Sequence, residues 1–258
     1  MQKQFFILIL ATLSFLASCK KDNDKPGPGN PSGTKVLKRI VETENNTTTT
    51  YTFSYDANKR LSSVVSTNNE EATFFTYDDK GNVIKLENRV DDETNLFTFT
   101  YTNNLPVSGT FKSFERSGTE EIITDRYDLF YTVNGGVVSK IKAVMMDPEN
   151  NQETYEVEYD LQYTNGNVTK IASSGWIPYS ATFTYGNKKP VYPVVFSYVM
   201  DPAGFSAQFS ARNELLSLAY DFSGTELDQV ITTTYTYDAE GYVLTANDGI
   251  TRSRFEYE

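Results

Sequence analysis

Histidine is absent from this chain of 258 residues. This absence excludes Ser-His-Asp and Cys-His catalysis, which need a histidine base, and a metal site with imidazole ligands. The only cysteine is Cys19, which excludes an internal disulfide and a cysteine-based zinc site. Any metal ion would have to be a hard cation held by oxygen, such as calcium. We expect no cofactor and no metal.

An excess of positive charge and long apolar runs are missing too. The chain carries 23 Lys and Arg against 34 Asp and Glu, a formal net charge of −11. Because nucleic-acid binding needs clustered Lys and Arg, we expect no nucleic-acid partner. No stretch of 18 apolar residues follows residue 18, which predicts no transmembrane helix after the N-terminal segment. Aromatic residues are abundant, with 18 Tyr and 17 Phe, so the chain is able to bury a large core.

Residues 1–18 have the pattern of a secretory signal peptide. Lys3 supplies the positive start, and the apolar stretch Phe5–Phe15 is too short to span a bilayer. The sequence Leu16-Ala17-Ser18-Cys19 then resembles the lipobox of bacterial lipoproteins. This resemblance implies that Cys19 is lipidated, becomes the mature N-terminus and attaches the protein to a membrane. The alternative is an ordinary signal peptide followed by a chance cysteine.

Residues 19–34 contain the anchor cysteine and a polar tether. The Pro, Gly, Asn and charged residues of this segment bury little surface, which predicts a flexible linker. Fully extended, about 15 residues reach roughly 50 Å and clear the lipid headgroups. The segment resembles the start of Bacteroidetes-type lipoproteins, which implies secretion across the inner membrane and anchoring to the outer membrane. Asp22 and Asp24 match in part the acidic surface-export signal of such proteins, which favours the cell surface and leaves the periplasmic face open.

From Lys35 onward, aromatic residues alternate with hydroxyl-bearing ones. Tyr51, Phe53 and Tyr55 are separated by Thr and Ser, and the pattern recurs over residues 97–101 and 182–185. Alternation places the aromatic side chains on one face of an extended chain and the hydroxyls on the other. This pattern predicts half-buried antiparallel strands.

The last aromatic residue of each such strand marks an internal repeat of β-hairpins. In seven of eight units the next apolar strand starts six residues after this anchor, as Val83 does after Tyr77. The intervening sequence Asp78-Asp79-Lys80-Gly81 has an Asp that caps a turn and a Gly for a left-handed backbone. Calcium binding by such Asp residues is the alternative, but they recur once per hairpin and form no single cluster. The anchors are Tyr55, Tyr77, Tyr101, Tyr131, Tyr163, Tyr185, Phe209, Tyr237 and Tyr257.

The sequences Phe75–Val83 and Tyr235–Val243 resemble the YD repeat of Rhs-type bacterial surface proteins. The chain from about residue 35 to residue 258 is similar to a family of uncharacterised Bacteroidetes secreted lipoproteins built from such hairpins. That resemblance implies a porin-like β fold and an envelope location. It implies no activity and no catalytic residues.

We therefore predict one all-β domain over residues 35–258. It is expected to be an antiparallel meander of about 16–18 strands, two per hairpin unit, rolled into a barrel or a strongly curved sheet. We expect strands of about six to eight residues, shorter than the 9–11 residues that cross a bilayer. The barrel is therefore not expected to span the membrane.

A meander places the short anchor turns at one end of the sheet and the longer connections at the other. Variable loops on a regular scaffold commonly carry function. We therefore predict a ligand-binding site at the long-loop end, formed by Trp176, Tyr179, Phe205 and Phe222. The alternative is that these aromatic residues cap the core. The predicted long connections are Asn68–Glu71, Val90–Thr94, Arg116–Glu121, Met146–Glu153, Ser174–Tyr179, Met200–Phe205, Asp221–Asp228 and Asn247–Ile250.

These observations favour a cell-envelope lipoprotein that acts as a binding or scaffold module, with a glycan or an envelope protein as the ligand. A purely structural protein that self-associates is the alternative. The least favoured hypothesis is a histidine-independent hydrolase using the carboxylates of Asp91-Asp92-Glu93 or Glu120-Glu121. We expect no enzymatic activity.

Overall fold

The computed structural model describes residues 35–117, 120–175, 178–201 and 204–258. Cys19 and Trp176, both singled out from the sequence, lie outside the described residues. The strands are β1 (Leu37–Glu44), β2 (Thr47–Tyr55), β3 (Leu61–Ser66), β4 (Glu71–Tyr77), β5 (Val83–Val90), β6 (Glu93–Thr102), β7 (Leu105–Ser117), β8 (Glu120–Asn134), β9 (Val137–Met146), β10 (Glu153–Thr164), β11 (Asn167–Ser173), β12 (Ser180–Tyr185), β13 (Leu215–Asp221), β14 (Gln229–Thr232), β15 (Thr234–Tyr237), β16 (Val243–Asn247) and β17 (Thr251–Tyr257), and the helix is α1 (Phe205–Gln208).

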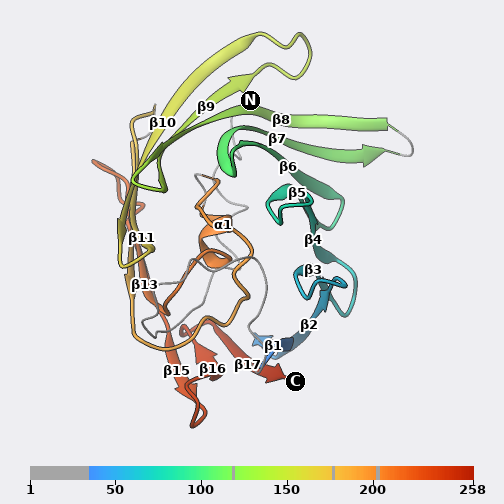
Figure 1. The fold of residues 1–258 in the computed structure, drawn as a ribbon, viewed down its shortest axis with the longest axis vertical. Helices are drawn as coiled ribbons and strands as arrows, with labels where there is room; N and C mark the ends of the chain where they lie inside the picture. The colour runs from blue at the N-terminus through green and yellow to red at the C-terminus, as the bar shows by residue number, and fades with distance from the viewer. Residues whose placement is uncertain (1–34, 118–119, 176–177, 202–203) are drawn as a thin grey trace.

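The 17 strands form one antiparallel sheet that rolls into a nearly closed barrel, as predicted. Each strand except β14 pairs with the next along the chain, and β17 pairs back with β1 over Leu37–Glu44. Figure 1 looks along the barrel and shows the strands as a ring around α1. The ring is irregular at Thr233, where β14 pairs only with β13 and β15 pairs only with β16.

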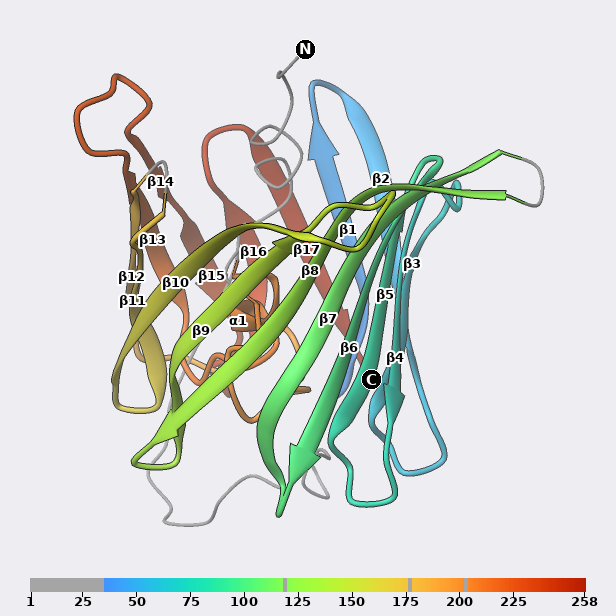
Figure 2. The ribbon, with the colours of Figure 1, turned by 90° about the horizontal axis from the view of Figure 1, so that it is seen from above.

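The short anchor turns and the long connections lie at opposite ends of the barrel, as the meander predicts (Figure 2). At the short-turn end, the Asp78 carboxylate accepts hydrogen bonds from the backbone N–H groups of Lys80 and Asn82, at 2.9 and 2.8 Å. Asp238 accepts the equivalent bonds from Glu240 and Tyr242. The Asn82 side chain together with these N–H groups lowers the pKa of Asp78, and the Lys35 ammonium, followed by the backbone bonds, lowers the pKa of Asp238. The predicted Asp-capped turns are therefore confirmed.

Residues 186–214, of which 202 and 203 lie outside the described part, form no strand and run through the barrel interior. We call them the inner segment. The six-residue offset predicted a strand that starts at Val191, after the anchor Tyr185, and the repeat predicted a strand that ends at the anchor Phe209; both predictions are wrong. Pro190 and Pro193 have no N–H group for a ladder. The continuous apolar run over residues 194–196 also suits a chain that is buried on all sides rather than on one face.

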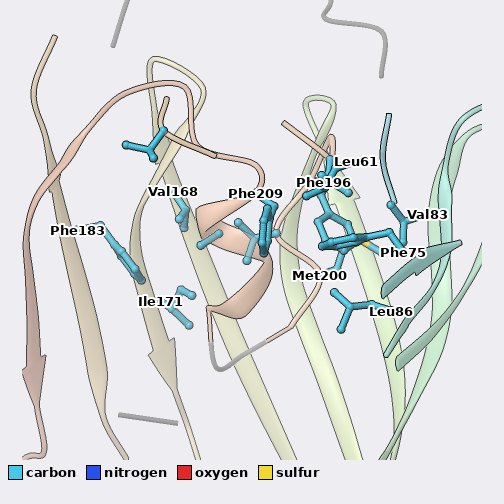
Figure 3. Packing of buried hydrophobic residues seen from close by; sticks show 14 of the residues in the cluster. Leu61, Phe75, Val83, Leu86, Val168, Ile171, Phe183, Phe196, Met200 and Phe209 are labelled. Atoms are coloured by element: carbon cyan, nitrogen blue, oxygen red, sulfur yellow. The ribbon is translucent and has the colours of Figure 1, made fainter. Parts of the chain in front are cut away.

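The inner segment completes the core of the barrel. Phe209 is 3% exposed, and its ring lies 5.2 Å from that of Phe75 on β4. Phe196 packs edge-on against the same ring at 6.4 Å, and Met200 is fully buried nearby (Figure 3). A barrel of this many strands has an interior too wide for its own side chains to fill. The inner segment therefore supplies the apolar side chains against which the inner face of the barrel packs.

The inner segment fills the half of the barrel nearest the short turns. The backbone N–H of Lys189 bonds the carbonyl of Gly241 in the β15–β16 turn at 3.4 Å. The Asn167 side chain, beside the β10–β11 turn, accepts from Arg212 N–H at 2.6 Å and donates to Asn213 at 2.6 Å. Contacts with two short turns close this end of the barrel.

The outer face of the barrel carries charged and hydroxyl side chains. Lys85 pairs with Glu87 at 2.6 Å, and Lys140 pairs with Glu158 at 2.5 Å. Six strands are longer than predicted, with 9 residues in β2 and 10 to 15 residues each in β6–β10. Strand length therefore fails as an argument about membrane insertion, but the charged outer face suits water. Separately, no helix among the described residues is long and apolar enough to cross a membrane.

Candidate functional site

Two of the predicted site residues meet at the long-loop end. The rings of Tyr179, just before β12, and Phe222, just after β13, lie 5.6 Å apart. Both side chains are half-buried. Reciprocal bonds hold Tyr179 to Ser173: the Ser173 N–H donates to the Tyr179 carbonyl at 2.9 Å, and the Tyr179 N–H donates to the Ser173 hydroxyl at 3.0 Å. On the other strand, the Phe222 N–H donates to the Asp228 carboxylate at 2.9 Å.

Two further aromatic residues extend this pair along the inner wall. Tyr220 stacks on Phe222 with ring centroids 6.1 Å apart, and Tyr159 on β10 lies 6.4 Å from Tyr179. We call these four residues the rim aromatic cluster. Sequence reasoning missed Tyr159 and Tyr220 because it assigned strand aromatics to the core. Their alternation signal would have placed them on the inner face but not beside these particular loops.

Phe205 is not part of this cluster. It begins α1 in the inner segment and packs on Phe209 with ring centroids 5.6 Å apart. The buried Asp201 carboxylate caps this turn by accepting from the N–H groups of Phe205 and Ser206, at 2.9 and 2.6 Å. The prediction that residues 200–205 connect two strands at the long-loop end is therefore wrong. For Phe205 the alternative, a core residue, fits the structure better.

Two inward-facing carboxylates lie on the opposite wall. Glu42 on β1 accepts a hydrogen bond from the Ser253 hydroxyl at 3.3 Å, and Glu71 on β4 accepts one from the Tyr51 hydroxyl at 2.9 Å. Burial, with a smaller effect from Glu71, raises the pKa of Glu42 to about 7. Glu42 thus titrates near neutral pH.

A second pair of carboxylates is formed by Glu93 on β6 and Asp125 on β8. The Ser113 hydroxyl donates to Glu93 at 2.8 Å, and Ser113 is paired across the sheet with Asp125. Burial, followed by the charge of Glu93, raises the pKa of Asp125 to about 6. None of the ion pairs between described residues involves Glu42, Glu71, Glu93 or Asp125.

The remaining carboxylates of the hydrolase hypothesis lie apart from Glu42, Glu71, Glu93 and Asp125. Asp91 and Asp92 are exposed in the β5–β6 turn. Glu121 pairs with Lys112 and Arg116 across the β7–β8 hairpin. Across residues 35–258, leaving out the three short gaps, no group of three or more Cys, Asp or Glu side chains is placed to hold a metal ion.

The fold resembles that of porin-like proteins from Bacteroides. A porin-like protein from Bacteroides vulgatus ATCC 8482 superposes with a TM-score of 0.56 at 10% identity, covering 87% of this chain and 99% of its own. A porin-like protein from Bacteroides uniformis ATCC 8492 gives a TM-score of 0.51 at 17% identity, covering 86% of this chain and 96% of its own. No protein-family model and no curated protein sequence matches this chain. At these identities the likeness shows a shared barrel fold.

Proposed function

We propose that this protein is an outer-membrane lipoprotein, anchored through Cys19, whose barrel binds a ligand at its long-loop end. The first described residue, Lys35, lies at the short-turn end, where its ammonium pairs with Asp238 at 2.7 Å. Val36 then exchanges two backbone hydrogen bonds with Glu258, each 2.9 Å long. The tether thus joins the barrel at the end that the inner segment closes. The opposite end is free to point away from the membrane.

The rim aromatic cluster is the observation that carries this proposal. Binding sites combine aromatic surface with a few polar groups that orient the ligand. Half-buried Tyr and Phe rings offer such surface at low conformational cost, and the hydroxyls of Tyr159, Tyr179 and Tyr220 add hydrogen-bonding groups. This combination suits the faces and hydroxyls of a sugar, so we favour a glycan over an envelope protein as the ligand.

Glycan-array binding by the detergent-solubilised full chain tests the proposal. We expect wild-type protein to bind a subset of glycans, and Tyr179→Ala with Phe222→Ala to lose that binding by at least tenfold. Trp176→Ala tests the third predicted residue of the same loops. The matched control is Phe130→Ala, which removes an aromatic ring that is 47% exposed on β8.

Two results would contradict this proposal. Wild-type protein that binds neither glycans nor any component of an envelope extract has no ligand of the proposed kind. Binding that survives the double substitution but is lost in Phe130→Ala would move the site from the rim to the outer wall. Circular dichroism of each variant separates loss of binding from loss of fold.

A further inference from the structure

Strand β14 has an unpaired edge. Residues 229–237 form two consecutive strands, β14 and β15, separated by Thr233. Strand β14 pairs with β13, whereas β15 pairs with β16. The last residue of β16 in this pairing is Asn247, opposite Thr234. β14 thus extends beyond the end of β16. In the described residues, no strand pairs with the edge of β14 that faces away from β13.

The backbone groups on this edge follow from strand alternation. The N–H of Thr233 bonds the carbonyl of Leu216 on β13 at 2.9 Å. Successive residues of a strand point their N–H and C=O groups to opposite sides. The groups of Val230 and Thr232 therefore point away from β13, toward the free edge. They are in position to pair with another strand.

Exposed apolar side chains surround the same edge. Leu227, Val230 and Ile250 are 65%, 69% and 71% exposed, the highest values among the large hydrophobic side chains of the described residues. Leu227 precedes β14 and Val230 lies within it. Ile250 lies in the β16–β17 turn, near the C-terminal end of β14. Monomeric proteins seldom gather such side chains on one surface without a partner.

The edge also lacks the features that keep strand edges apart. Natural proteins guard exposed edges with charged side chains, proline or bulges. The sequence Gln229-Val230-Ile231-Thr232-Thr233 has neither charge nor proline, and its pairing with β13 shows no register shift. Two of its five residues are apolar and four are β-branched, which favours extended pairing.

We infer that β14 is a dimerisation edge, which pairs antiparallel with β14 of a second copy of this chain. An antiparallel pair reverses the second strand, so the residues before β14 of one copy lie beside the β16–β17 turn of the other. Leu227 then covers Ile250 of the second copy. Asp228 approaches Arg252, an exposed residue with no ion pair among those found in the described residues. Neutral strands and opposite charges at their ends make the edge self-complementary.

This geometry explains the choice of a second copy over a foreign strand. Exposed apolar side chains lie at β14, as Leu227 and Val230 do, and in the β16–β17 turn, as Ile250 does. Antiparallel pairing of two copies would place Leu227 of one copy beside Ile250 of the other. The inference is independent of ligand binding at the rim, since it uses no residue of the rim aromatic cluster.

Disulfide trapping in the envelope tests the pairing. In the lipoprotein proposed above, acylation consumes the thiol of Cys19, and the chain has no other cysteine, so Leu227→Cys with Ile250→Cys supplies the only free thiols. Mild oxidation should yield a species of twice the chain mass on a non-reducing gel. Adding Val230→Lys should reduce that species by about tenfold, because a charged side chain, lysine above all, discourages pairing between strand edges.

A charge on a strand that is paired on both sides serves as the control. Phe130→Lys places the same charge at an exposed position of β8 that is paired with Ser108 on one side and Lys142 on the other, and should leave the trapped dimer unchanged. A trapped dimer that persists in Val230→Lys, or only monomer in the parent double-cysteine protein, would overturn the inference. A cross-linked product of another mass would identify a foreign partner and overturn it equally. Mass photometry of the solubilised wild-type chain gives an independent reading, with dimer expected.

Discussion

The hydroxyl of Tyr77 donates a hydrogen bond to the backbone carbonyl of Leu61 at 2.7 Å. The same bond recurs one hairpin earlier, from Tyr55 to Leu37 at 2.8 Å, and one hairpin later, from Tyr101 at 2.8 Å. Each of these three hydroxyls thus reaches the start of a strand in the neighbouring hairpin. Over these hairpins the aromatic repeat seen in the sequence is therefore a series of links between successive hairpins.

Tyr77→Phe should destabilise the barrel by about 1 kcal/mol, the usual contribution of one hydrogen bond. The ring stays in place, so only the hydroxyl and its bond to Leu61 are lost. Urea denaturation of wild type and variant measures the difference. Tyr198→Phe is the control, because the Tyr198 hydroxyl makes no hydrogen bond within the part of the chain that the structure describes. Equal effects of the two substitutions would show that the link contributes nothing specific.

Asp78→Ala should also destabilise the protein by about 1 kcal/mol, because the β4–β5 turn loses the acceptor of two backbone N–H groups. Asp79→Ala changes the exposed neighbour in the same turn and should have little effect. The pKa of Asp78 lies below its usual 3.8, so its stabilisation is present above that pH and lost as pH falls through the folded value. Thermal melts of both variants at neutral and acidic pH check the contrast.

The strands and turns were predictable because each depends on nearby residues. Alternation around Phe53 and the Asp78–Gly81 turn act within a few positions. The inner segment was not predicted, because the repeat spacing continued through Val191 and concealed the prolines on either side of it. Whether such a stretch joins the wall or fills the interior depends on the radius of the closed barrel, which is a property of all the strands together.

The candidate site was predictable only in part, for the same reason. Tyr179 directly precedes β12 and Phe222 directly follows β13, and these two strands pair although the whole inner segment separates them in the sequence. Their loops were chosen correctly, but their contact depends on that long-range pairing. Phe205 was misplaced because its loop was assumed to join two strands of the wall.

Phe209→Ala should cost about 3–5 kcal/mol, the usual range for removing a buried Phe. The Phe209 ring contacts Phe75 and Tyr192, each at 5.2 Å, so its loss leaves a cavity where the inner segment meets the wall. Phe205→Ala should cost less, because that ring is half-buried, and should not affect glycan binding. Denaturant unfolding together with the array separates the two roles. Loss of binding in Phe205→Ala without loss of stability would return Phe205 to the site.

Cys19→Ser should release the protein from the membrane. Without the thiol there is no lipid attachment, and the remaining chain has an outer face that suits water. We expect wild-type protein in the detergent phase of a Triton X-114 partition and the variant in the aqueous phase. Loss of labelling by a radioactive fatty acid would accompany that shift. Retention of the variant in washed membranes would mean that the barrel itself binds the membrane or a membrane protein.

Glu42→Gln should stabilise the barrel at neutral and higher pH. Burial raises the pKa of Glu42 from 4.5 to about 7, so the folded state keeps a proton that the unfolded state has lost in that window. Stability therefore falls as pH rises from 4.5 to 7, by an amount on the order of 3 kcal/mol at most. The amide of Gln does not titrate, so unfolding free energies should fall less steeply for the variant over this range. Glu87→Gln should have the opposite sign, because Lys85 and Arg89 lower the pKa of Glu87 and its charge stabilises the fold. Parallel pH profiles of Glu42→Gln and wild type would show that Glu42 ionises normally within the folded barrel.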